Sequence, residues 1–199
     1  MVESTISMTM KRIHRPEDKQ VSQIIAAARR DPQKFGELYA LYAQPVYRYL
    51  YSRIGSVPEA EDVTAQTFLA ALEHFPKYQH DGYFASWLFS IARNKTMDFF
   101  RQRRNETSLD ETEIVAEDSN LLQQIIKTER IIALSKLIRS LSFDEQELIR
   151  LRYVADLRFA EIGHLLNQKE DTVKKTLYRL LARLKAQTDT EYPMENSHV

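Results

Sequence analysis

The sequence predicts an all-α protein made of two small helical domains joined by a flexible acidic linker. Two observations predict the helices: glycine occurs only 4 times in 199 residues, and apolar residues recur at helical spacing along most of the chain. A third predicts the division, because an acidic stretch near the middle interrupts that spacing.

The composition limits the class of protein. The length allows one or two domains at about 150 residues each, and 28 basic residues balance 28 acidic ones. The lack of cysteine excludes disulfide scaffolds, thiolate zinc sites and a cysteine nucleophile, and favours a reducing cytoplasm. Residues 1–20 lack the apolar core of a signal peptide, and the apolar stretch 83–92 is too short to span a bilayer, so we expect no membrane insertion.

The first domain is predicted to be a helical bundle over residues 21–104. A short helix ends before Pro32, and a longer one begins at Phe35 and ends at Gly55. Pro58 and the acids after it begin a third helix, which ends near residue 74. We expect this helix to bury its apolar residues Val63, Phe68, Leu69 and Leu72. A helix over residues 84–103 completes the bundle.

The linker is predicted at residues 105–120 and the second domain at residues 121–187. Between residues 105 and 126 there are six acids and no lysine or arginine. In the second domain, Ser142 and Glu145 predict a capping box at the start of a helix. Asn167 separates a short helix, residues 159–166, from one that begins near Asp171, because asparagine tolerates the left-handed conformation of a sharp turn.

The last two of these helices have the pattern of a helix-turn-helix. Helical spacing turns one set of residues inward: Ile162, Leu165, Leu166, Val173, Leu177, Leu180, Leu181 and Leu184. A second set then faces outward and suits the major groove of DNA: Lys174, Lys175, Tyr178, Arg179 and Arg183. An ordinary helical hairpin has the same apolar spacing and remains the alternative.

Residues 84–95 combine aromatic side chains with arginine, lysine and asparagine. Such a mixture suits the stacking of unpaired bases and the neutralisation of their phosphates, as single-strand binding requires. The alternative is that Trp87 and Phe89 belong to the core. Basic residues at 93–104 and 169–185 flank the acidic linker, so two cationic helices are available for phosphate, or simply keep the helices soluble.

Residues 84–104, FASWLFSIARNKTMDFFRQRR, resemble the second conserved region of the extracytoplasmic-function (ECF) sigma factors, which direct bacterial RNA polymerase to promoters. AEDVTAQTF at residues 60–68 is similar to the earlier part of that region. LSFDEQELIRLRYVADLRFAEIG and TVKK, within residues 134–185, are similar to the fourth region. The likeness covers most of residues 35–185, and its two halves coincide with the two predicted domains.

The resemblance implies a non-enzymatic protein without metal or cofactor, which binds the clamp and flap regions of core RNA polymerase, binds promoter DNA and is held by an anti-sigma factor. The residues implied to contact the melted minus-ten strand are Lys77, Tyr78, Tyr83, Trp87, Arg93, Asn94, Lys95 and Arg101. Those implied to read the minus-thirty-five duplex are Thr172, Lys174, Lys175, Tyr178, Arg179 and Arg183. Those implied to bind the polymerase are Glu61, Asp62, Ala65, Gln66, Phe68 and Leu69.

The sequence departs from the family pattern in three places. The usual glutamine of the polymerase-binding helix falls on Ala65, with Gln66 next to it; Asn167 replaces the usual turn glycine, and Gly163 replaces a common alanine. Two other functions are weighed against a sigma factor. A duplex-only helix-turn-helix regulator explains the second domain but not residues 84–95. A helical metal hydrolase would use His74, His80 and Asp81, which are too few for a ligand set.

Overall fold

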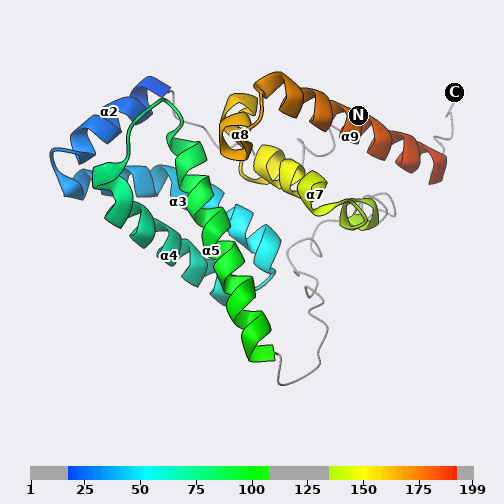
Figure 1. Cartoon of the computed structure of the whole chain (residues 1–199), viewed down its shortest axis with the longest axis horizontal. Helices are drawn as coiled ribbons and strands as arrows, with labels where there is room; N and C mark the ends of the chain where they lie inside the picture. The colour runs from blue at the N-terminus through cyan, green and yellow to red at the C-terminus, as the bar shows by residue number, and fades with distance from the viewer. Residues whose placement is uncertain (1–17, 108–134, 192–199) are drawn as a thin grey trace, which may run out of the picture.

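The computed structural model describes residues 18–107 and 135–191, and all regular elements within these two ranges are helical (Figure 1). The first unit contains α2 (Asp18–Ala28), α3 (Phe35–Ile54), α4 (Val57–His74) and α5 (Phe84–Thr107), with short 3₁₀ turns η1 (Pro32–Lys34) and η2 (Phe75–Lys77). Helices α3, α4 and α5 pack against one another, and α2 packs on α3. The predicted bundle is present.

Local chemistry sets the ends of these helices. Gly55 ends α3 in the left-handed conformation, with φ 82°, which a residue without Cβ adopts at little cost. A proline in the first turn begins α4. Helix α4 buries Val63 and Phe68 as predicted, but Leu69 is 59% exposed and Leu72 43% exposed. The prediction that these two leucines are buried is wrong, because helical spacing does not distinguish a core from a face left open.

The second unit contains α7 (Phe143–Ile149), the π-helical segment η4 (Arg150–Val154), α8 (Phe159–Leu166) and α9 (Glu170–Glu191). Ser142 and Glu145 form the predicted capping box. Asn167 has φ 53° and ψ 46°, the predicted left-handed turn between α8 and α9. The predicted linker and the helix expected from residue 121 fall mainly in residues 108–134, outside the described part of the chain.

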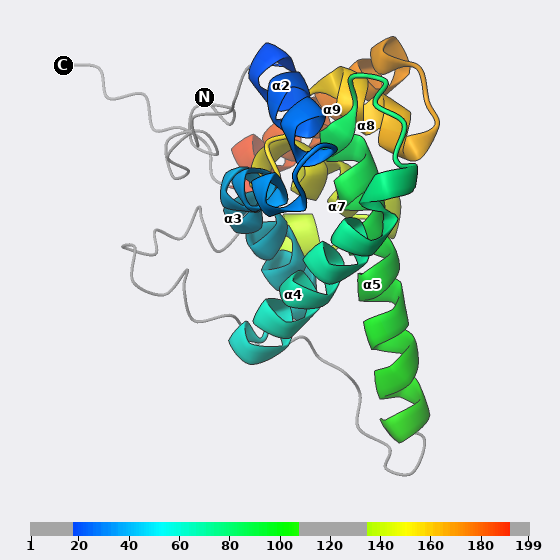
Figure 2. The same cartoon turned by 90° about the vertical axis from the view of Figure 1, so that its left-hand side faces the viewer.

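The two units are in direct contact. Helix α5 packs against α8, and α3 packs against η4 (Figures 1 and 2). Buried apolar side chains of both units belong to a single hydrophobic cluster. Between residues 18–107 and 135–191, no helix is long and apolar enough to cross a membrane.

Candidate nucleic-acid interfaces

Helix α9 separates an apolar face from a cationic one, as predicted. Val173, Leu177 and Leu184 are fully buried, while Leu165 and Leu166 of α8 are partly buried. The opposite face carries exposed side chains from five of the six predicted duplex contacts, Thr172, Lys174, Lys175, Tyr178 and Arg179. This is the geometry of a helix-turn-helix, in which the second helix enters a major groove and its lysines reach phosphates.

The turn between α8 and α9 depends on a close backbone approach. A Cβ at Gly163 would lie 2.7 Å from the carbonyl oxygen of Gln168, which is closer than real contacts allow. The amide of Gln168 donates to the carbonyl of Gly163 at 2.8 Å, and Asn167 makes the left-handed turn between them. Glycine at position 163 therefore fixes how closely the turn folds back on α8.

Arg183, the sixth predicted duplex contact, is paired within its own unit. Its Nη2 donates to Oε1 of Glu145 at 2.6 Å. Together with the hydrogen bond from the Ser142 backbone, the Arg183 guanidinium lowers the pKa of Glu145 below its usual 4.5. This exposed pair links the start of α7 to α9 and thereby helps to set the direction of the recognition helix.

The predicted minus-ten residues divide into an exposed group and a buried one. Asn94 and Lys77 are exposed, Lys95 is half-buried, and exposed Arg101 pairs with Asp98 at 2.8 Å. Tyr78, by contrast, is buried: its ring lies 4.6 Å from that of Trp87 and 5.6 Å from that of Phe84.

The buried tyrosine organises the loop before α5. The backbone carbonyl of Tyr78 accepts a hydrogen bond from Arg29 at 2.7 Å, and its hydroxyl lies 3.0 Å from Nδ1 of His80. Burial raises the pKa of Tyr78, so the phenol remains a neutral donor. Trp87 is half-buried on this aromatic group, whereas Phe89 is fully buried. The core alternative therefore applies to Phe89, and Trp87 keeps one side accessible.

Helix α4 presents the predicted polymerase-binding residues on one mostly exposed face. Glu61, Asp62, Ala65, Gln66 and Leu69 are exposed. Gln66 donates to Asp62 at 2.6 Å. Phe68 is buried, and the half-exposed ring of Tyr39 lies 4.8 Å from it. Leu69, Leu72 and Tyr39 thus form an exposed apolar group beside acidic side chains, an arrangement typical of a surface that binds another protein.

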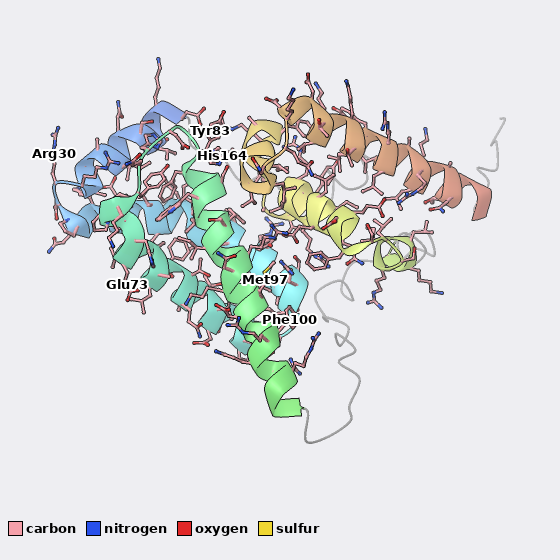
Figure 3. The ribbon with its side chains drawn as sticks, in the orientation of Figure 1. Arg30, Glu73, Tyr83, Met97, Phe100 and His164 are labelled. Atoms are coloured by element: carbon pink, nitrogen blue, oxygen red, sulfur yellow. The ribbon has the colours of Figure 1, made fainter. Side chains whose placement is uncertain are left out.

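The loop before α5 also touches the second unit. Tyr83 stacks on His164 of α8 with ring centroids 4.6 Å apart, and Nε2 of His164 lies 3.0 Å from Asp81 (Figure 3). The hydroxyl of buried Ser86 donates to the carbonyl of Glu161 at 2.8 Å. Three neighbours in or next to the predicted minus-ten region are therefore in contact with α8, and sequence reasoning did not anticipate these contacts.

A second inter-unit contact centres on Glu147 of α7, which no sequence argument singled out. Its Oε1 accepts from the Tyr49 hydroxyl at 2.6 Å, and both residues are buried. Arg53 Nη1 lies 3.5 Å from Glu147 Oε2, and Arg93 Nε lies 3.7 Å from Oε1. Burial and the negative charge of Glu147 raise the pKa of Tyr49, so the phenol donates its proton to the carboxylate.

The histidines weighed as metal ligands point to separate partners. His74 Nδ1 contacts the carbonyl of Ala70 at 2.7 Å, His80 lies between Ser22 and Tyr78, and Asp81 pairs with His164. Within the described ranges, no three His, Cys, Asp or Glu residues are arranged to hold a metal ion.

Comparison with known proteins identifies the family. Residues 38–106 match Sigma-70 region 2, and residues 131–184 match Sigma-70 region 4. The ECF RNA polymerase sigma factor SigM of Bacillus subtilis is 31% identical over 151 residues, which cover 75% of this chain and 92% of SigM. The chain belongs to the ECF group of sigma-70 factors. The ECF sigma factor BldN of Streptomyces coelicolor is 33% identical over 156 residues, but only 58% of BldN is covered.

A solved structure supports the fold of this ECF sigma factor. CnrH, determined in complex with the cytosolic domain of CnrY, matches with a TM-score of 0.56 at 22% identity, and the match covers 87% of this chain and 99% of that one. In the described part of the sigma factor, α3, α4 and α5 carry region 2, and α7, η4, α8 and α9 carry region 4. It is a transcription initiation factor and not an enzyme.

Proposed function

We propose that this sigma factor divides promoter recognition between two surfaces. The exposed face of α9, with Lys174, Lys175, Tyr178 and Arg179, reads the minus-thirty-five duplex. Asn94 and Lys95 of α5, with Trp87 beside them, capture the melted minus-ten strand. The observation that carries the proposal is that both groups are exposed on separate helices, one with helix-turn-helix geometry and the other next to an accessible aromatic ring.

The two surfaces make different energetic contributions. Lysine and arginine on α9 gain affinity by releasing counterions from duplex phosphates, and they fix the register of the protein on the DNA. An unpaired base that stacks on an aromatic side chain gains about 1–3 kcal/mol. This gain offsets the loss of base stacking in the duplex, so capture at α5 favours the melted state.

The proposed partners are core RNA polymerase, promoter DNA and an anti-sigma factor, all in the cytoplasm. The exposed face of α4 suits the polymerase clamp because it combines Leu69 and Leu72 with Asp62 and Gln66. Region 4 is assigned to the flap. For the anti-sigma factor, CnrH offers a fold-level parallel, since it was solved with a protein partner. The proposed functional domains are residues 21–104 and 121–187, with residues 105–120 as linker.

Reconstitution with core polymerase tests the division. A holoenzyme should bind promoters recovered from a genomic footprint and open a bubble at each start site. Asn94→Ala should impair bubble formation, measured by permanganate reactivity, more than formation of the closed complex. Equal loss in both steps contradicts the assignment of α5. Duplex binding without any effect of core polymerase would instead favour a duplex-only regulator.

A further inference from the structure

The contact around Glu147 joins the two regions through a buried but incompletely satisfied ion cluster. The Glu147 side chain is 2% exposed and that of Arg53 5%. One hydrogen bond, from Tyr49, reaches the carboxylate. In the described part of the chain, Glu147 Oε2 and Arg93 Nε are buried without a hydrogen-bond partner.

Positive charge exceeds negative charge in this cluster. Arg53 and Arg93 of region 2 lie near the carboxylate, and Arg150 of η4 feels both Glu147 and Arg53. Burial lowers the pKa of Arg150, and the charge of Arg53 lowers it further, so the three guanidinium groups are poorly compensated. Buried ion pairs with incomplete hydrogen bonding contribute little net stability, because desolvation opposes their attraction. The closed arrangement of the two regions is therefore easily released.

Region 2 would present these groups as an anion site if region 4 moved away. Tyr49 supplies a hydroxyl donor, and Arg53 and Arg93 supply guanidinium groups that favour phosphate oxygens. A carboxylate from the other region occupies this position now, with two oxygens. A phosphodiester carries the same single charge and has more acceptor oxygens, so it matches two guanidinium groups better than Glu147 does.

We propose that Tyr49, Arg53 and Arg93 form a phosphate site for single-stranded promoter DNA, and that Glu147 occupies this site while regions 2 and 4 are packed together. The proposal rests on the function assigned to α5 above. The strand and the carboxylate compete for the same donors, so the closed arrangement and strand capture exclude each other. The same movement uncovers Ser86 and Tyr83, which contact α8 in the closed arrangement.

Energetic coupling makes the competition measurable in two ways. If DNA and Glu147 compete, DNA shifts the chain toward the open arrangement, and weakening of the Glu147 contact raises DNA affinity by the same factor. That factor is limited by the closed-to-open ratio of the wild-type chain, because only the open fraction binds.

Glu147→Gln is the test substitution, made in the full chain. The amide that replaces the carboxylate keeps its shape and still accepts from Tyr49, but it leaves the guanidinium groups without a counter-charge. Removal of one partner from a buried pair typically shifts such an equilibrium about a hundredfold or more. Asp144→Asn on the same helix is the matched control, because Asp144 is exposed and loses the same charge outside the contact.

Opening is measured by energy transfer between dyes at Gln33→Cys and Gln187→Cys. Both positions are exposed, and the chain has no other cysteine. Affinity is measured by fluorescence anisotropy with a labelled random-sequence single-stranded DNA. We expect Glu147→Gln to reduce energy transfer and to bind this DNA at least tenfold more tightly, with Asp144→Asn near wild type. Its salt slope should steepen by about 0.7 for each phosphate gained.

Arg93→Gln, added to Glu147→Gln, should reverse most of the affinity gain without restoring energy transfer. Opening without tighter DNA binding would overturn the phosphate site, and tighter binding without opening would overturn the competition. Equal effects of Asp144→Asn and Glu147→Gln would also overturn it, since general repulsion would then explain the result. Promoter-specific transcription by the wild-type holoenzyme is assayed in parallel. Its absence counts against the proposed function, whereas failure of the binding tests alone counts only against the phosphate site.

Discussion

Substitution of Gly163 by alanine should destabilise region 4, although glycine-to-alanine changes inside helices usually stabilise. The new Cβ would lie 2.7 Å from the Gln168 carbonyl oxygen, about 0.7 Å short of an ordinary contact of 3.4 Å. The obstacle is backbone and cannot rotate away. Overpacking of this kind costs about 1–3 kcal/mol, against a gain of about 1 kcal/mol from helix propensity. We expect a net loss of about 1 kcal/mol, or a fall of about 4–8 °C in Tm.

Gly36→Ala supplies the matched control, because a Cβ there meets nothing within 4 Å and Gly36 lies near the start of α3. It should stabilise the chain by about 0.4–1 kcal/mol. Far-UV circular dichroism follows both regions, while fluorescence of Trp87, the only tryptophan, follows region 2. Gly163→Ala should shift the first signal to lower temperature more than the second. If it stabilises the chain as Gly36→Ala does, the close approach of turn and helix is refuted.

Three further predictions concern exposed residues. Lys174→Ala should lower the salt slope of duplex binding by about 1, measured by anisotropy; an unchanged slope contradicts the placement of α9. Leu69→Asp should weaken core-polymerase binding at least tenfold in a pull-down titration while Tm stays unchanged, because the side chain is 59% exposed; unaltered binding removes α4 from the interface. The folded-state pKa of Glu145 is lowered, so its stabilisation is present above about pH 4.5 and is lost as the pH falls through the lowered pKa. The stability difference between wild type and Glu145→Gln, measured by urea unfolding, should shrink in acid; a constant difference contradicts the ion pair with Arg183.

Local features of the fold could be predicted because neighbouring residues determine them. Gly55, Ser142 and Asn167 mark a helix end, a helix start and a turn through their own backbone and side-chain chemistry. The two faces of α9 follow from helical spacing alone, which is why the exposed cations were identified correctly.

Contacts between distant parts of the chain were beyond sequence reasoning. Tyr49 and Glu147 are 98 residues apart, and nothing near Glu147 distinguishes it from a solvated acid. Leu69 was expected both in the core and at the polymerase, and only tertiary structure decides that it is exposed. Tyr78 was expected beside DNA from its loop position, but the structure buries it against Trp87; its role as a direct base contact stays a prediction.

The π-helical segment η4 has a consequence for the geometry of region 4. The amide of Ala155 donates to the carbonyl of Arg150 at 2.9 Å, so this turn accommodates one residue more than an α-helical turn. Each residue of an α-helix advances the chain by about 100° around the axis. Deletion of a single residue here would restore regular winding and rotate everything downstream by a similar angle. The surplus residue therefore sets the angular offset between the side of α7 that meets its neighbour and the side of α9 turned to the double helix.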